Sequence, residues 1–131
     1  MEAFKDGAQA VNPSIAFSVV YLGTFDDVVK GKEAATSMAG TGVDVIYHIA
    51  DAAGIGVING ARESGIKVVG WGVDQHDVAP DTIIGSQVID QAKEIGDMCR
   101  DLTLGRFGGG TVKGDGLRSG VVSMSRLYNV G

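Results

Sequence analysis

The stretch VDVIYHIADAAGIGVINGARESGIKVVGWGV, which covers Val43–Val73, decides the fold. Its two ends, Val43–Ile49 and Ile66–Val73, are apolar and rich in β-branched residues, a composition typical of buried strands. Residues 54–64 carry a helical pattern, and Gly65 is placed to end that helix. A strand, a helix and a second strand at this spacing predict a βαβ unit with parallel strands.

The same alternation continues on both sides of this stretch. The further predicted elements are a helix over Glu2–Val11 ended by Asn12-Pro13, a strand over Ile15–Leu22, a helix capped by Thr24 or Asp26 that runs to about Gly40, a strand over residues 82–88 and a helix over Gln91–Leu104. This order predicts an α/β fold whose parallel sheet is flanked by helices that cover both faces.

The C-terminal residues 105–131 differ in composition from the rest of the chain. Glycines divide this segment into short pieces, and two of them, near Thr111-Val112 and over Gly120–Met124, predict short strands. We expect residues 1–104 to form an α/β ligand-binding lobe and the glycine-rich segment to belong to the same domain.

Composition and charge exclude several classes of protein. The chain has 131 residues, of which 44% are hydrophobic and 21% charged, which fits one globular domain. The net charge is −5 and no basic run stands out, so nucleic acid and anionic membranes are not expected partners. The lone cysteine, Cys99, excludes an internal disulfide and is expected to be a small buried residue of a helix.

Ligands of an open parallel sheet bind beyond the carboxyl ends of its strands. The aromatic, polar and glycine residues at those ends are Phe25, Asp26 and Asp27; His48, Asp51, Ala52 and Gly54; Trp71, Gly72, Asp74, Gln75, His76 and Asp77; and Ser86 and Gln87. Rings stack on planar ligands, and carboxylates accept hydrogen bonds from hydroxyl or ring N–H groups. We therefore expect these loops to bind a flat polar molecule such as a heteroaromatic base or a sugar.

The residues alone leave structural roles open for the same side chains. Asp26 or Asp27 could only cap a helix, Phe25 and Trp71 could belong to the core, His48 could be an interior histidine, and His76 a solvated loop residue.

A second hypothesis is a nucleotide-dependent oxidoreductase built on the turn GIGVING, Gly54–Gly60. This turn loosely matches a dinucleotide fingerprint, with Asp74 near the end of the next strand. No catalytic constellation accompanies it, GGGTVKGDG lacks the ending of a phosphate-binding loop, and no Cys/His cluster has metal-ligand spacing. We expect no catalytic residue, no metal and no cofactor.

Several stretches of the chain resemble one known family. They are FKDGAQAVNP, YLGTFDDVVKGKEAA, GVDVIYHIADAAGIGVINGARESG, DQHDVAPDTIIGS and GRFGGGTVKGDGLRSGVVSM. In this order they resemble the basic membrane protein family of extracytoplasmic solute-binding lipoproteins, which includes purine nucleoside receptors. Its members resemble type I periplasmic binding proteins, in which two α/β lobes clamp a ligand and deliver it to an ABC importer.

The resemblance implies that this chain is the second lobe of such a protein. Its ligand would be a small nucleoside-like solute, and its partner in the full-length protein an ABC transporter permease. The full-length family is extracytoplasmic and anchored as a lipoprotein, whereas MEAFKDG at the start of this chain shows no signal peptide.

The resemblance also implies that the first lobe, and a central strand before Met1, lie outside this chain. We expect the chain to compensate by pairing with another copy or by rearranging its C-terminal strands. A homo-oligomer is therefore one expected partner state, and a vestigial self-associating module is a third functional hypothesis.

The ligand-binding residues implied by the resemblance are Phe25, Asp26, Asp51, Ala52, Gly54, Gly72, Asp74 and Gln75. Phe25 matches an aromatic residue that stacks on the ligand base. Gly72 stands where the family commonly has an aspartate for ribose hydroxyls, and Ile89 stands where it usually has a lysine. Each lost charged hydrogen bond costs about 1.5–3 kcal/mol, so we expect weak binding unless Asp51 takes over hydroxyl recognition.

Overall fold

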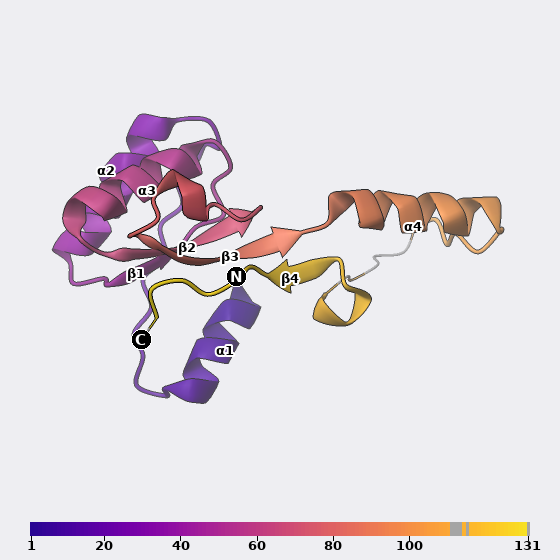
Figure 1. Cartoon of the computed structure of the whole chain (residues 1–131), viewed down its shortest axis with the longest axis horizontal. Helices are drawn as coiled ribbons and strands as arrows, with labels where there is room; N and C mark the ends of the chain where they lie inside the picture. The colour runs from indigo at the N-terminus through magenta and orange to yellow at the C-terminus, as the bar shows by residue number, and fades with distance from the viewer. Residues whose placement is uncertain (111–113, 115, 131) are drawn as a thin grey trace.

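A computed structural model describes residues 1–110, 114 and 116–130 of the chain (Figure 1). Its elements are α1 (Glu2–Val11), α2 (Val28–Gly40), β1 (Val45–Tyr47), α3 (Ala53–Ser64), β2 (Lys67–Gly72), η1 (His76–Val78), β3 (Ile83–Ile89), α4 (Gln91–Thr103), η2 (Leu117–Ser119) and β4 (Val122–Met124).

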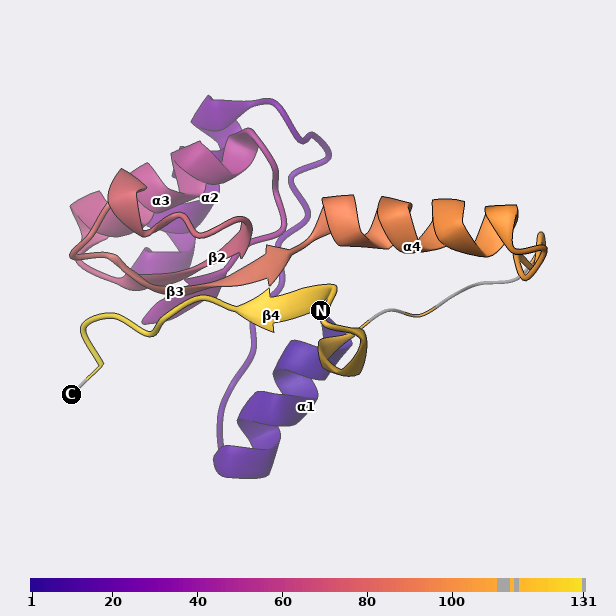
Figure 2. The same cartoon turned by 45° about the vertical axis from the view of Figure 1, so that its right-hand side comes forward.

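The sheet has the strand order β1-β2-β3-β4. β1, β2 and β3 are parallel, with Ile46 opposite Val68, whereas β4 runs antiparallel to β3 with Val88 opposite Ser123 (Figure 2). The predicted α/β class with a mainly parallel sheet is confirmed, and the predicted short strand over Gly120–Met124 corresponds to β4. The strand expected near Thr111-Val112 lies outside the described residues. The division at residues 104 and 105 stays a prediction.

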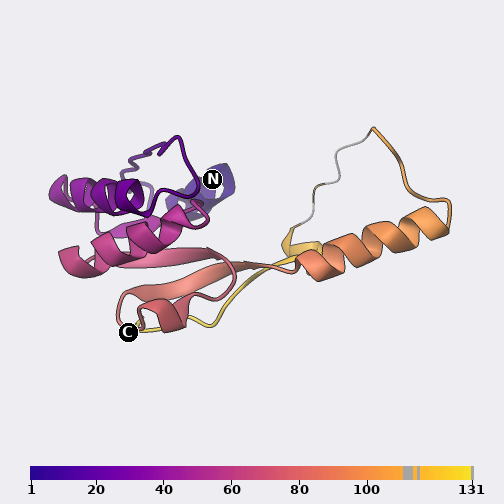
Figure 3. The same ribbon diagram turned by 90° about the horizontal axis from the view of Figure 1, so that it is seen from above.

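Helices α2 and α3 lie together on one face of the sheet (Figure 3). Their approach is close because glycines replace side chains at the contact. A Cβ atom on Gly31 would lie 2.1 Å from the Ala53 carbonyl oxygen, and one on Gly56 would lie 1.9 Å from the Val28 carbonyl oxygen. Only a residue without a side chain fits at either position.

The core lies between these helices and the sheet. One cluster joins Ile58 of α3 to Val68 of β2 and Ile83 of β3, all fully buried. A second joins Ala35 of α2 to Ile46 of β1. Burial of a side chain such as Ile58 stabilises the folded state by about 1.5–3 kcal/mol. Because the Ile58 cluster includes residues of both β2 and β3, α3 packs across these two strands.

Helix α3 ends as the sequence predicts. Gly65 adopts φ 72°, and its amide donates to the Ala61 and Arg62 carbonyls. The start of α2 differs by a small shift, because Asp27 rather than Thr24 or Asp26 is the cap and its side chain accepts from the Lys30 amide.

The expectation that helices cover both faces of the sheet is wrong for α4. Asp90 alone separates β3 from α4, too short a connection for the helix to fold back, and α4 extends away from the sheet (Figures 1 and 3). Neither α1 nor α4 has a buried residue. Cys99 in α4 is therefore exposed, contrary to expectation.

The predicted strand over Ile15–Leu22 is also wrong. These residues are extended but belong to no strand, and among the described residues no backbone–backbone hydrogen bond involves residues 16–22. The β-branched composition favours an extended backbone, but a strand also needs a neighbour to pair with, and the edge of β1 does not reach this segment.

No helix in the described part of the chain is both long enough and apolar enough to cross a membrane.

We expect Gly56→Ala to lower the free energy of unfolding by about 3 kcal/mol, because its Cβ atom would collide with the backbone of α2. Urea unfolding monitored by circular dichroism measures the change. Gly7→Ala in α1 is the matched control: nothing lies within 4 Å of its Cβ position, and stability should stay unchanged or rise by up to about 1 kcal/mol. Equal stability of the two variants would contradict the packing described here.

Candidate functional site

The loops that follow the extended segment, β1 and β2 meet along one edge of the fold, which we call the rim (residues 23–27, 48–54 and 72–77). The Ala53 amide donates to the Phe25 carbonyl at 2.9 Å, which joins the first loop to the second. His48 and Gln75 are in hydrogen-bond contact at 2.9 Å, which joins the second loop to the third. These bonds bring together three of the four strand ends that the sequence predicts as a site, whereas Ser86 and Gln87 of the fourth lie within β3.

The first loop presents the Phe25 ring to solvent. The side chain is 67% exposed although its backbone is fixed by Ala53, so the ring is available to a ligand and does not belong to the core. Asp26 is exposed and accepts a hydrogen bond from the Thr24 hydroxyl. Asp27 is committed to capping α2.

The second loop turns sharply before α3. Asp51 adopts φ 49°, a left-handed conformation that is uncommon for residues other than glycine, and it is exposed together with Ala52. Gly54 is buried, and its amide donates to the Asp51 carbonyl at 2.9 Å. Gly54 thus shapes the turn, and its contact with a ligand stays a prediction.

His48 fills the space beneath this turn. It is 4% exposed, and a Cβ atom on Gly54 would lie 2.4 Å from its Cε1 atom. The Gln75 side-chain oxygen can only accept, so His48 Nε2 carries the proton, and Nδ1 has no partner among the described residues. Burial lowers the pKa of His48, which keeps the ring neutral near pH 7.

Gln75 connects the loops from inside. Its side-chain oxygen accepts from the Trp71 amide at 3.0 Å as well as from His48, and its backbone amide donates to the Ser86 hydroxyl at 3.1 Å. Gly70 makes room for this arrangement, since a Cβ atom there would lie 2.6 Å from both Gln75 Oε1 and Ser86 Oγ. Gln75 therefore positions the rim, and its predicted direct contact with a ligand stays a prediction.

Asp74 is exposed next to the sharp bend at Gly72, whose φ is 88°. Its carboxylate accepts from the Tyr128 hydroxyl at 2.7 Å and from the His76 amide at 3.1 Å. The Tyr128 hydrogen bond is the main cause that holds the pKa of Asp74 below its ordinary value, and the same bond raises the pKa of Tyr128. Each carboxylate oxygen of Asp74 therefore already accepts a hydrogen bond, Oδ2 from Tyr128 and Oδ1 from His76, and keeps a further lone pair.

Sequence reasoning missed Tyr128. Its ring stacks on His76 with a centroid distance of 3.6 Å and an interplanar angle of 10°. The backbone path that places it there is long-range: the Tyr128 amide donates to the Ile84 carbonyl, and Asn129 donates to the Pro80 carbonyl. No local sequence pattern around Tyr128 predicts these contacts.

The stretch Gly54–Gly60, predicted as a turn, lies within α3, and its glycines have a packing role. Gly54 accommodates the His48 ring, Gly56 accommodates the backbone of α2, and a Cβ atom on Gly60 would lie 2.6 Å from the Lys32 carbonyl oxygen. Close packing thus explains the glycines that suggest a dinucleotide fingerprint. Within residues 1–110, 114 and 116–130, no three His, Cys, Asp or Glu residues are grouped as metal ligands.

A family model described as ABC transporter substrate-binding protein PnrA-like matches residues 1–130 of the chain. Among curated relatives, basic membrane protein A2 of Borrelia garinii subsp. bavariensis is 37% identical over 91% of this chain and 36% of its own length. The ABC transporter nucleoside-binding protein BmpA of Lactococcus lactis subsp. cremoris is 30% identical over 94% of this chain and 40% of its own length. The chain thus spans less than half of either relative.

Two solved structures share the fold. A solute-binding protein of an ABC transporter system from Aeropyrum pernix superposes with a TM-score of 0.73 at 30% identity, over 91% of this chain and 34% of that one. A transcriptional activator of the comK gene from Bacillus halodurans superposes with a TM-score of 0.83 at 29% identity, over 99% of this chain and 45% of that one.

We expect Tyr128→Phe to raise the pKa of Asp74 toward its ordinary value of 3.8, because the variant loses the hydrogen bond that stabilises the carboxylate. In the unmodified chain the pKa of Asp74 is lower in the folded state than in the unfolded state. The hydrogen bond from Tyr128 therefore stabilises the fold at pH values above the unfolded-state pKa. This stabilisation is lost as the pH falls through the folded-state pKa. A carbon-detected NMR titration of the Asp74 carboxyl group measures the shift. Tyr21→Phe, at an exposed tyrosine, is the control; an unchanged pKa in Tyr128→Phe would contradict the contact.

Proposed function

Because the chain belongs to the PnrA-like family of ABC transporter substrate-binding proteins, we propose that its rim forms one wall of a binding site for a nucleoside-like solute. The observation that carries this proposal is the exposed Phe25 ring, held at the rim through its own carbonyl. An exposed aromatic ring on a fixed backbone is a stacking surface that loses little entropy when a flat ligand arrives.

The carboxylates of Asp51 and Asp74 would accept hydrogen bonds from the ligand hydroxyls. Both are exposed, and Asp74 keeps acceptor capacity beside the bond from Tyr128. Asp26 and Ala52 lie on the loops that carry Phe25 and Asp51, so they would border the same ligand. Gly72 shapes the bend that orients Asp74, while Gly54 and Gln75 would act mainly by holding the loops in place.

The ligand would be enclosed only when a second lobe closes over this wall. The chain spans 36% to 40% of the two curated relatives described above, so the full protein would supply the opposite wall and the contacts that Gly72 and Ile89 do not make here. Closure of this kind sets the buried contact area and therefore the affinity. The wall alone is expected to bind weakly.

In the full protein we place this function outside the cytoplasm, on a lipid-anchored receptor that delivers its solute to an ABC transporter permease. The role requires binding and release without chemistry, so no catalytic residue is assigned. The oxidoreductase alternative is not favoured, because packing accounts for the glycines of Gly54–Gly60 and the Lactococcus lactis relative is named a nucleoside-binding protein.

NMR titration of the chain with inosine tests the proposal. We expect weak, millimolar binding with shifts confined to the three rim loops, and a three- to tenfold weakening, roughly, in Phe25→Ala through loss of stacking. Phe107→Ala is the matched control, because Phe107 is also exposed but lies far along the chain after α4.

Shifts outside the rim, or equal effects of Phe25→Ala and Phe107→Ala, would contradict the site. Micromolar binding that Phe25→Ala abolishes would contradict the expected weakness of the single wall while supporting the site itself. A parallel fluorescence titration with NADH separates the oxidoreductase alternative, since binding of NADH but not inosine would favour it.

A further inference from the structure

The side chain of Asp74 is held from outside its own loop. Its Oδ2 atom accepts a hydrogen bond from the Tyr128 hydroxyl at 2.7 Å, and its Oδ1 atom accepts one from the His76 amide at 3.1 Å. The Ser86 hydroxyl lies farther from Oδ1, at 3.5 Å, beyond the usual range of such a bond. The bond from Tyr128 is thus the shortest of the three, and it comes from a residue 54 positions away in the sequence.

Tyr128 can hold the carboxylate because its own backbone is fixed beside β3 (Figure 2). Its amide donates to the Ile84 carbonyl at 2.9 Å, and the Ser125 amide donates to the Ser86 carbonyl at 2.8 Å, so the segment after β4 continues alongside β3. The Tyr128 ring stacks on His76, which holds the ring against the third rim loop. The hydroxyl therefore donates from an anchored position.

The protonation states of the pair suit this role. The Tyr128 hydrogen bond is the main cause that lowers the pKa of Asp74, and the same bond raises the pKa of Tyr128. Near pH 7 Asp74 is therefore ionised, and Tyr128 keeps the proton that it donates. Removal of the hydroxyl would leave Asp74 ionised at this pH, because the ordinary pKa of an aspartate is 3.8. An effect of Tyr128 on binding near pH 7 must then come from the orientation of the carboxylate and not from its charge.

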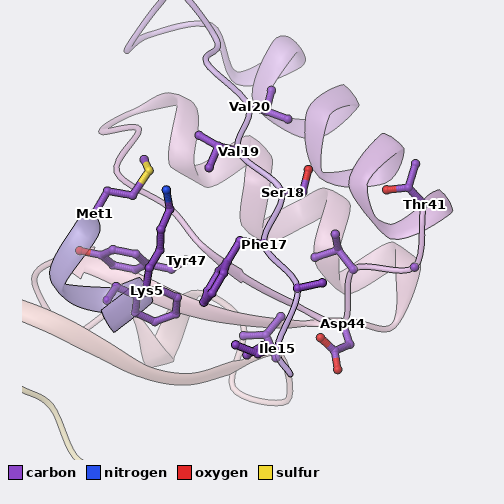
Figure 4. A pocket seen from close by; sticks show the side chains of 15 residues that line it. Met1, Lys5, Ile15, Phe17, Ser18, Val19, Val20, Thr41, Asp44 and Tyr47 are labelled. Carbon is purple, nitrogen blue, oxygen red and sulfur yellow. The ribbon is translucent and has the colours of Figure 1, made fainter. Parts of the chain in front are cut away.

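Orientation matters because Asp74 is exposed. The cavity of about 560 Å³ between α1, residues 15–20 and the outer edge of the sheet lies elsewhere (Figure 4). It is lined by none of the rim residues, all of which the structure describes. An exposed carboxylate without partners can turn about its side-chain bonds, and a ligand that fixes it does so at a cost in entropy. Tyr128 and the His76 amide fix it before a ligand arrives.

The fixed carboxylate suits two adjacent hydroxyl groups. A carboxylate has about four lone-pair positions on its two oxygens, and the bonds from Tyr128 and the His76 amide occupy one position on each oxygen. One position on each oxygen of Asp74 stays open, in an orientation that the protein has already set. Two neighbouring secondary hydroxyls of a ribose ring can donate to these two positions, whereas a sugar without these hydroxyls cannot.

We propose that Tyr128 is a positioning residue that orients the Asp74 carboxylate toward the vicinal hydroxyls of a ribose, and that it thereby sets a preference for ribonucleosides over dideoxynucleosides. This inference rests on the proposed function and adds the recognition of the sugar to it. Phe25 stacks on the base, whereas Tyr128 acts on the sugar through Asp74.

NMR titration of the full chain with inosine and with dideoxyinosine, which has the same base but lacks both secondary ribose hydroxyls, is the test. We expect Tyr128→Phe to weaken inosine binding about three- to tenfold and to leave dideoxyinosine binding unchanged, because the variant keeps the ring on His76 and loses only the hydroxyl. In the unmodified chain, dideoxyinosine should bind more weakly than inosine by at least that factor, a comparison that needs no variant.

Two further variants complete the experiment. Tyr21→Phe, at an 85% exposed tyrosine outside the rim, should change the binding of neither nucleoside. In an Asp74→Ala background, Tyr128→Phe should have no further effect on inosine binding, because the group that it orients is gone. Amide spectra show whether each variant keeps the fold.

Inosine binding at the rim that is equally strong in Tyr128→Phe would overturn this inference and leave the proposed function standing. Equal weakening for both nucleosides would show that Tyr128 acts only on the stability of the rim, and a further loss in the Asp74→Ala background would show that it acts by another route; either result would overturn the inference too. Absence of inosine shifts at the rim of the unmodified chain would overturn the proposed function, and this inference with it.

Discussion

The structure depends on one contact between two helices, the close approach of α2 and α3 with the hydrogen bond from the Ala53 amide to the Phe25 carbonyl. The first amides of a helix have no partner within it, and Ala53 is fully buried. Leaving this amide unpaired would cost about 1–3 kcal/mol, so the fold must bring a carbonyl to it. Because that carbonyl belongs to Phe25, the same bond that completes α3 holds the aromatic ring at the rim.

Beyond the bond between Ala53 and Phe25, further hydrogen bonds connect the other loops of the rim. His48 fits only against Gly54, and Gln75 joins His48 to Trp71 and Ser86. Tyr128 then fixes Asp74 from the far end of the chain. The aromatic ring and the carboxylates thus lie on loops that are connected before any ligand arrives, and such preorganisation lowers the cost of binding. A half-open wall of this kind suits a receptor that closes over its solute.

Local sequence patterns predicted the features that depend on neighbouring residues alone. The βαβ unit over Val43–Val73 and the helix end at Gly65 follow from periodicity and from the left-handed conformation that glycine adopts freely. The rim loops follow from parallel topology. The place of Tyr128 and the unpaired backbone of residues 16–22 could not be predicted, because both depend on which distant backbone lies alongside. The course of α4 depends on the single residue Asp90 before it.

Residues 15–22 lead directly into the loop that carries Phe25. Amide hydrogen exchange at Ala53, measured by NMR, tests the central claim that α2, α3 and the rim are held together by this one contact. The account predicts protection comparable to that of the buried residues of α3, such as Ile58. Exchange at the rate of an unstructured peptide would show that the Phe25 loop is not held against α3, and it would contradict the account.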